Sequence, residues 1–258
     1  MGRGGGELMR ALRLMCVAGL ILAIDVRVAG AQSTLWTDKV RVSVNVGGQL
    51  SSTTFTSTAA PLIYLEPATI TTSYTTPKGL LFDGGFLVRV AGNFGVGAGL
   101  SAYSAHHDAA VNGSVPHPFF FNTPRTLSGT AASLQRSEVT ANIQAAYVLV
   151  SSHLDVVFAG GPSIFRVGQD LVSNAILAET YPYDTVAFTS ATTERAEKTK
   201  LGFNVGADVG YRLSHNVGIG GLVRYSRVSL SLPLTGSASD VSVDAGGLQV
   251  GGGVRFYF

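Results

Sequence analysis

Cysteine and long apolar runs are what this 258-residue chain has least of. The single cysteine is Cys16, so residues 32–258 form no disulfide and offer no thiolate to a structural zinc site. After residue 31 no stretch approaches the ~20 apolar residues that a transmembrane helix needs. The mean hydropathy is nevertheless +0.30, which is high for a soluble domain. High hydropathy without a helical span favours a membrane β-barrel.

Charge is also scarce, at 13% of all residues, and the formal net charge is +2. The positive excess lies in residues 1–31, which hold four arginines against Glu7 and Asp25. Residues 32–258 then carry 14 basic and 14 acidic side chains. A neutral chain gives no electrostatic reason to bind nucleic acid, so we expect no nucleic-acid partner.

The first 31 residues are typical of a secretory signal peptide. An apolar stretch of about ten residues lies between positions 14 and 24, which is too short to span a membrane. Ala29-Gly30-Ala31 matches the small-residue pattern of cleavage sites, so we expect cleavage after Ala31 and a mature domain of residues 32–258. The positive region before the apolar stretch consists of Arg3, Arg10 and Arg13.

Eight segments of the mature chain alternate apolar and polar residues with the period of two that marks a β-strand. Each is long enough for a transmembrane strand of about 9–11 residues. Short turns and long connections alternate between them, the long ones being residues 52–78, 106–133, 168–198 and 230–240. The segments are residues 39–51, 79–91, 94–105, 134–150, 154–167, 199–213, 217–229 and 241–258.

The two faces of these segments differ sharply in chemistry. One face is apolar, as in Val42, Val44 and Val46, and we find no charge on it within the expected hydrocarbon band. Because an outward Arg or Lys at the bilayer midplane costs about 2–4 kcal/mol, lipid would impose such a partition. The other face is expected to form a polar interior network of Arg41, Asp83, Arg89, Arg136, Glu138, Asp155, Asp208, Arg212, Arg224 and Arg255.

Aromatic residues on the apolar face gather towards the two ends of the segments. Phe94, Tyr147 and Tyr211 lie near the short turns, whereas Phe203 and Tyr225 lie near the long connections. Aromatic girdles at both membrane interfaces would produce this distribution, although strand preference for aromatics would also contribute.

One segment departs from the pattern. Gly160-Gly161-Pro162 interrupts the fifth segment, and proline cannot donate a hydrogen bond to a closed sheet. We therefore expect a β-bulge there, which leaves the faces of Phe165 and Arg166 unassigned.

The last strand carries the strongest resemblance to known proteins. Residues 248–258 alternate apolar and polar and end on Phe256, Tyr257 and Phe258. This ending resembles the closing strand of Gram-negative outer-membrane barrels, in which Phe256 and Phe258 would be read by the barrel-assembly machinery. The whole mature chain resembles a barrel-only OmpA/OmpX-type protein: all-β, an eight-stranded antiparallel up-and-down transmembrane β-barrel. The resemblance implies a monomer in the outer membrane, in contact with lipid and lipopolysaccharide, with both termini periplasmic.

An eight-stranded lumen is just wide enough to be filled by side chains. The interior arginines and acids therefore predict a plug of salt bridges and hydrogen bonds. A narrow, porin-like and anion-friendly channel for small solutes is the first alternative, and an outer-membrane lipid-modifying enzyme is the second. We expect no cofactor and no enzyme activity, because His106, His107, Asp108 and His117 lack a serine at the spacing of outer-membrane lipid-modifying enzymes.

The long connections are the remaining candidates for function. Residues 69–76 are rich in Thr and read as β-structure. They predict a hairpin that extends above the membrane and offers an edge for strand addition by an extracellular protein, unless the hairpin is merely solvated. We therefore expect an envelope-structural or surface-interaction role.

Overall fold

The computed structural model describes residues 35–235, 237 and 240–258. The predicted signal peptide, with Ala29 and Ala31, lies outside the described residues. In the part described, no helix is long and apolar enough to cross a membrane. The strands are β1 (Val40–Gln49), β2 (Thr53–Ala59), β3 (Leu62–Ile63), β4 (Glu66–Pro67), β5 (Thr69–Thr76), β6 (Gly79–Ala91), β7 (Phe94–Val115), β8 (Arg125–Ser151), β9 (Leu154–Glu179), β10 (Val186–Arg212), β11 (Val217–Leu232) and β12 (Val241–Tyr257).

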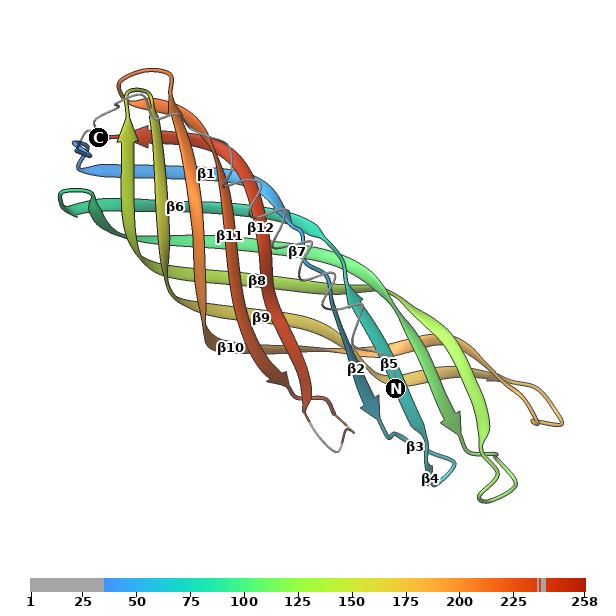
Figure 1. The fold of residues 1–258 in the computed structure, drawn as a ribbon. Coiled ribbons are helices and arrows are strands. Elements are labelled where there is room, and N and C mark those ends of the chain that lie inside the picture. The colour runs from blue at the N-terminus through green and yellow to red at the C-terminus, as the bar shows by residue number, and fades with distance from the viewer. Residues whose placement is uncertain (1–34, 236, 238–239) are drawn as a thin grey trace, which may run out of the picture. The chain divides into compact units, whose positions relative to one another are not determined.

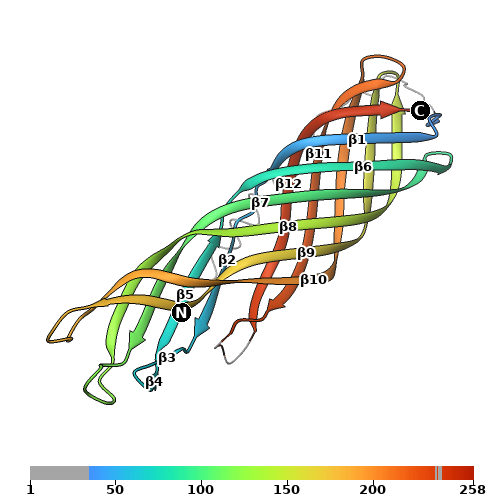
Figure 2. The same cartoon turned by 180° about the vertical axis from the view of Figure 1, so that it is seen from behind.

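Eight of these strands close into a barrel. β1 pairs with β6, each of β6 to β11 pairs with the next strand, and β12 returns to pair with β1, always antiparallel. Closure is visible in Figures 1 and 2, where β1 and β12 lie side by side near the C-terminus. The predicted fold class, an eight-stranded antiparallel up-and-down barrel, is confirmed.

Most of the predicted long loops are strand. β7 and β8 extend through residues 106–115 and 125–133, and β9 and β10 extend through residues 168–179 and 186–198. The loop predictions for 106–133 and 168–198 were therefore wrong, because these segments continue the antiparallel ladders beyond the predicted barrel. The predicted β-structure at residues 69–76 is confirmed as β5, which pairs with β2 and with β7.

The two faces of the sheet exchange polarity along each long strand. In β11, residues up to Tyr225 place Ile219 and Val223 outward and Arg224 inward. Beyond Tyr225, Arg227 is outward while Leu230 is buried, although the register with β12 continues without a shift. The same positions of β11 keep facing outward, but beyond Tyr225 the apolar residues occupy the inward positions instead of the outward ones. The barrel therefore has two parts with opposite polarity.

The first part, which we call the belt, exposes apolar side chains and consists of residues 40–50, 80–104, 137–164, 201–225 and 248–258. Val44, Ile143 and Val223 are each at least 50% exposed, and none of the belt's outward positions, all of them described, carries a charge. Such a surface suits the hydrocarbon of a bilayer. Its outward aromatic side chains are Phe82, Phe86, Phe94, Tyr147, Phe158, Phe203, Tyr211, Tyr225, Phe256 and Phe258.

The second part, which we call the distal extension, lies beyond the belt at the end away from the C-terminus (Figure 1). Its interior is an apolar core that includes Phe55, Leu127, Phe165, Leu171 and Leu230. Its outer surface begins with charged pairs, among them Arg166–Glu197 and Arg227–Asp244. An apolar interior with a polar exterior is the arrangement of a water-soluble domain.

Pro162 does not form the β-bulge that was predicted. β9 keeps its alternation through this residue, because Phe165 is buried and Arg166 is exposed. Pairing with β8 is only interrupted, between Asn142↔Ser163 and Ala145↔Gly160, and the register is the same on both sides of the gap. Proline lacks the N–H that the ladder would use, so omission of a few pairs is sufficient.

Two glycines lie where β12 leaves β1. Gly246 and Gly247 have φ values of +88° and +129°, which L side chains rarely adopt. A Cβ on Gly247 would lie 2.4 Å from the Cβ of Ser51. Beyond this point β2 pairs only with β5, so among the described strands its other edge has no partner.

Candidate functional site in the barrel lumen

An aspartate in the lumen binds two arginines. Asp208 of β10 accepts hydrogen bonds from Arg41 Nη2 at 2.5 Å and from Arg255 Nε and Nη2 at 3.0 and 2.7 Å. Arg41 also lies 3.0 Å from Asp155, which accepts a hydrogen bond from Tyr257 at 2.7 Å. Arg41, Arg255 and Asp155 are at most 5% exposed. The cluster thus links β1, β9, β10 and β12.

Glycines provide the space for this cluster. A Cβ at Gly210 would lie 2.5 Å from Asp155 Oδ1 and 3.0 Å from Arg41 Nη2. A Cβ at Gly220 would lie 3.0 Å from Arg255 Nε. Larger residues at these two inward positions would displace the ion pairs.

Two further ion pairs are buried in the lumen, and one of them joins strands on different sides of it. Asp83 of β6 accepts a hydrogen bond from Arg224 Nη1 of β11 at 2.5 Å. Glu138 of β8 accepts one from Arg136 Nε at 2.8 Å and one from the backbone N–H of Gly246 at 2.9 Å. All four charged side chains are buried. The Glu138 contact fastens β12 to the opposite wall where β12 parts from β1.

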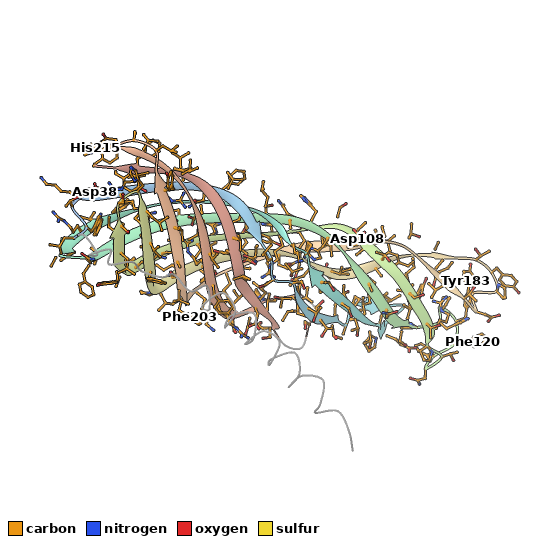
Figure 3. The ribbon with its side chains drawn as sticks, turned by 45° about the horizontal axis from the view of Figure 1, so that its top comes forward. Asp38, Asp108, Phe120, Tyr183, Phe203 and His215 are labelled. Atoms are coloured by element: carbon orange, nitrogen blue, oxygen red, sulfur yellow. The ribbon has the colours of Figure 1, made fainter. Side chains whose placement is uncertain are left out.

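The two remaining interior arginines have partners that the strand pattern did not include. Arg89 Nη1 donates to the carbonyl of Trp36 at 2.7 Å. Arg212 makes a bidentate pair with Asp38, and its guanidinium lies 4.0 Å from the ring centroid of Tyr257. Trp36 and Asp38 precede β1, so a search restricted to strands misses them. Figure 3 places Asp38 near His215, at the barrel end with the short turns.

Amide and hydroxyl side chains fill the space between the ion pairs. Gln144 Nε2 donates to Asn204 Oδ1 at 2.5 Å, and Asn204 Nδ2 donates to Ser163 Oγ at 2.7 Å. Ser163 in turn donates to Asn142 at 2.7 Å. The chain of contacts joins β8, β9 and β10 through Asn142, Gln144 and Asn204.

A small cavity of about 60 Å³ lies among these groups. Its lining includes Arg41, Asp83, Gln144, Asp208 and Arg224. Arg41 Nε has no hydrogen-bond partner among the described protein atoms. A cavity of this size with several polar groups in its wall can hold water, which would satisfy such a donor.

The histidines do not converge on one site. His106 is exposed and His107 is buried, because they point to opposite faces of β7. His107 Nε2 lies 3.4 Å from Gln169 Nε2, and His117 Nδ1 accepts a hydrogen bond from the backbone N–H of Phe119. Within the described residues, no group of three or more His, Cys, Asp or Glu side chains is placed to hold a metal ion.

His107 lies in the distal extension, where its environment disfavours the charged imidazolium. Burial lowers the pKa of His107 below its usual value, and the positive charge of Arg136 adds to the effect. The neutral imidazole of His107, beside Gln169, thus lies between the ion pairs of the lumen and the apolar core of the distal extension.

Several solved structures are similar to the chain in fold, among them the following three. No protein-family model matches the sequence, and no curated protein matches it. The structure of Neisserial surface protein A has 14% identity and a TM-score of 0.42, and the match covers 85% of this chain and 97% of that protein. The outer membrane protease OmpT from Escherichia coli has 8% identity and a TM-score of 0.48, with 87% and 98% covered.

The third similar structure is Ail, the attachment invasion locus protein of Yersinia pestis, in complex with the heparin analogue sucrose octasulfate. Its identity is 11% and its TM-score 0.35, with 84% of this chain and 99% of that protein covered. Similarities this low transfer no ligand and no activity to this chain.

Proposed function

We propose that the chain is an outer-membrane protein of a Gram-negative bacterium, exported through a signal peptide of residues 1–31. Its barrel is closed to solutes, and its distal extension stands at the cell surface for contact with partners. The apolar belt supports the membrane location. A continuous outward surface of apolar side chains without charges is unfavourable in water and suits the hydrocarbon of a bilayer. The barrel works as a monomer, since the eight strands close without a second copy.

The closure of the lumen carries this proposal. Asp208 and Asp83 each pair with an arginine of another strand, and Glu138 of β8 accepts a hydrogen bond from the backbone of Gly246 on β12 across the lumen. Beyond them an ion would have to pass the apolar core of the distal extension, where Phe165 and Leu171 are fully buried. An ion entering such a core would lose its hydration without gaining a polar partner.

The proposed role is non-enzymatic. His107 and His117 each use a ring nitrogen in a structural contact, and neither is hydrogen-bonded to a serine within the described residues. The buried acids of the lumen are held by arginines, so their carboxylate oxygens are already engaged in ion pairs and hydrogen bonds.

Three kinds of partner follow from the exposed features. Phe256 and Phe258, at the end of the closing strand, are the proposed signal for the barrel-assembly machinery, and the belt contacts outer-membrane lipid and lipopolysaccharide. The free edge of β2 offers backbone groups from Thr53 to Ala59 for strand addition by an extracellular protein.

Single-channel recording in planar bilayers tests whether the barrel is closed. We expect the purified folded protein to give no stable conductance steps, because side chains from facing strands fill the lumen. A known porin added to the same bilayer is the positive control. Reproducible anion-selective channels from the protein itself would favour the alternative, a narrow porin-like channel lined by arginines.

A further inference from the structure

Large apolar side chains are exposed at the far end of the distal extension. They belong to three tips: the β3–β4 hairpin, the loop of residues 116–124 and the loop of residues 180–185. Figure 3 labels Phe120 and Tyr183 at this end, opposite Asp38 and His215. The six most prominent side chains, which we call the tip cluster, are Leu62 (74% exposed), Leu65 (87%), Phe119 (68%), Phe120 (62%), Phe121 (73%) and Tyr181 (82%).

A buried arginine fastens two of the tips together. Arg125 Nη2 donates to the carbonyl of Pro116 at 2.6 Å and to Glu179 at 2.5 Å, and its Nη1 donates to the carbonyl of Tyr183 at 3.0 Å. The hydroxyl of Tyr64 donates to the same Glu179 carboxylate, which brings in the β3–β4 hairpin. The three tips are therefore one connected platform.

The loop of residues 116–124 is also stabilised by contacts of its own side chains. His117 Nδ1 accepts hydrogen bonds from the backbone N–H groups of Phe119 and Phe120 at 3.1 and 3.3 Å. The rings of Phe119 and Tyr183 meet edge to face at 5.5 Å. The phenylalanines thus stay exposed although the loop has defined partners, and an ordered apolar patch of this kind marks an interaction site.

The three tips carry a net negative charge, which makes an anionic partner unfavourable. Glu66, Glu179 and Asp184 stand against Arg125, and these fully described segments contain no lysine. A net acidic platform repels an anionic surface and tolerates a neutral one. Phe, Tyr and Leu on protruding tips suit a deformable apolar medium, and aromatic side chains favour the headgroup level of a bilayer.

We propose that the tip cluster inserts into a second lipid bilayer with zwitterionic headgroups, apposed to the membrane that the barrel spans. This inference rests on the proposed function, because the distal extension must face away from the cell. Insertion would bury the six side chains of the tip cluster at the level of the lipid headgroups. The acidic residues below them would stay in water.

Vesicle flotation tests this insertion. The purified protein, folded in nanodiscs, is mixed with phosphatidylcholine vesicles, and we expect it to float with them. Replacing Phe119, Phe120 and Phe121 together by Ser should reduce the bound fraction at least tenfold. The variant Ile176→Ser is the control, because Ile176 is 50% exposed on β9 but does not belong to the tip cluster, and it should bind like the wild type.

A fluorescence measurement provides a second readout. The chain contains one tryptophan, Trp36, which is 1% exposed in the lumen. The variant Phe120→Trp should therefore add an emission that shifts to the blue with phosphatidylcholine vesicles and is quenched by brominated lipid. The Trp36 emission of the wild type should not change.

Three outcomes would overturn the proposal: no flotation of the folded protein with phosphatidylcholine, undiminished flotation of the triple variant, or binding only to vesicles that contain phosphatidylserine. Folding in the nanodisc is verified by the slower or faster gel mobility of unheated against boiled protein. The flotation assay uses purified protein and does not depend on the orientation of the barrel in the cell. A negative flotation result would therefore contradict insertion of the tip cluster without contradicting the proposed surface location.

Discussion

Replacing Asp208 by Ala should lower the free energy of unfolding of the barrel by about 3–5 kcal/mol, because it leaves buried positive charge without its counter-ion. Arg255 would lose both of its contacts to a carboxylate, and Arg41 would keep only Asp155. Neither arginine can reach bulk water, since both are at most 5% exposed. Urea-induced unfolding of the protein in lipid vesicles measures the loss.

The exposed ion pairs of the distal extension provide the matched control. Glu197 pairs with Arg166 and Arg195 at the surface, where water and salt screen the charges. Glu197→Ala should leave the unfolding midpoint unchanged. If Asp208→Ala also unfolds like the wild type, the lumen is wet enough to solvate its arginines, and the plug is wrong.

A positive charge on the belt should also be costly. Val223 is outward, 50% exposed and lies near the middle of the apolar surface of β11. Val223→Arg should destabilise the barrel in a bilayer by about 2–4 kcal/mol, the cost of an arginine that faces lipid at the midplane. The same urea titration measures this difference.

The same substitution eight residues farther along the strand should be harmless. Ser231 also faces outward, but it lies beyond Arg227 in the distal extension, where the outer surface is polar. Ser231→Arg should therefore unfold at the wild-type midpoint. Equal losses from the two arginine substitutions would mean that lipid does not contact the belt selectively.

The strands of the barrel could be predicted because lipid imposes a strict alternation, whereas their full length could not. In β11 the apolar positions move from odd to even numbers after Tyr225, as Val228, Leu230 and Leu232 show. An alternation with one phase ends at such a point, so the prediction stopped the segment at residue 229. The change of phase was itself the signal for a strand that passes from lipid into water.

The lumen was predictable in its chemistry but not in its pairings. Alternation identifies Arg41, Asp208 and Arg255 as inward residues, yet their distances depend on the stagger of strands that are far apart in sequence. Asp38 and Trp36 lie before the first strand, where no periodicity marks them. The bulge predicted at Pro162 was wrong for a related reason: a missing N–H can be accommodated by an interrupted ladder without an extra residue.

The most direct test of a barrel with opposite polarity in its two parts is single-cysteine labelling along β11, which is practical because Cys16 is the only cysteine in the sequence. Intact cells carrying His215→Cys, Val223→Cys or Ser231→Cys are treated with a membrane-impermeant maleimide. We expect label only on the Ser231→Cys variant, label on His215→Cys once the outer membrane is permeabilised, and none on Val223→Cys until the protein is unfolded. Label on Val223→Cys or His215→Cys in intact cells would contradict the account.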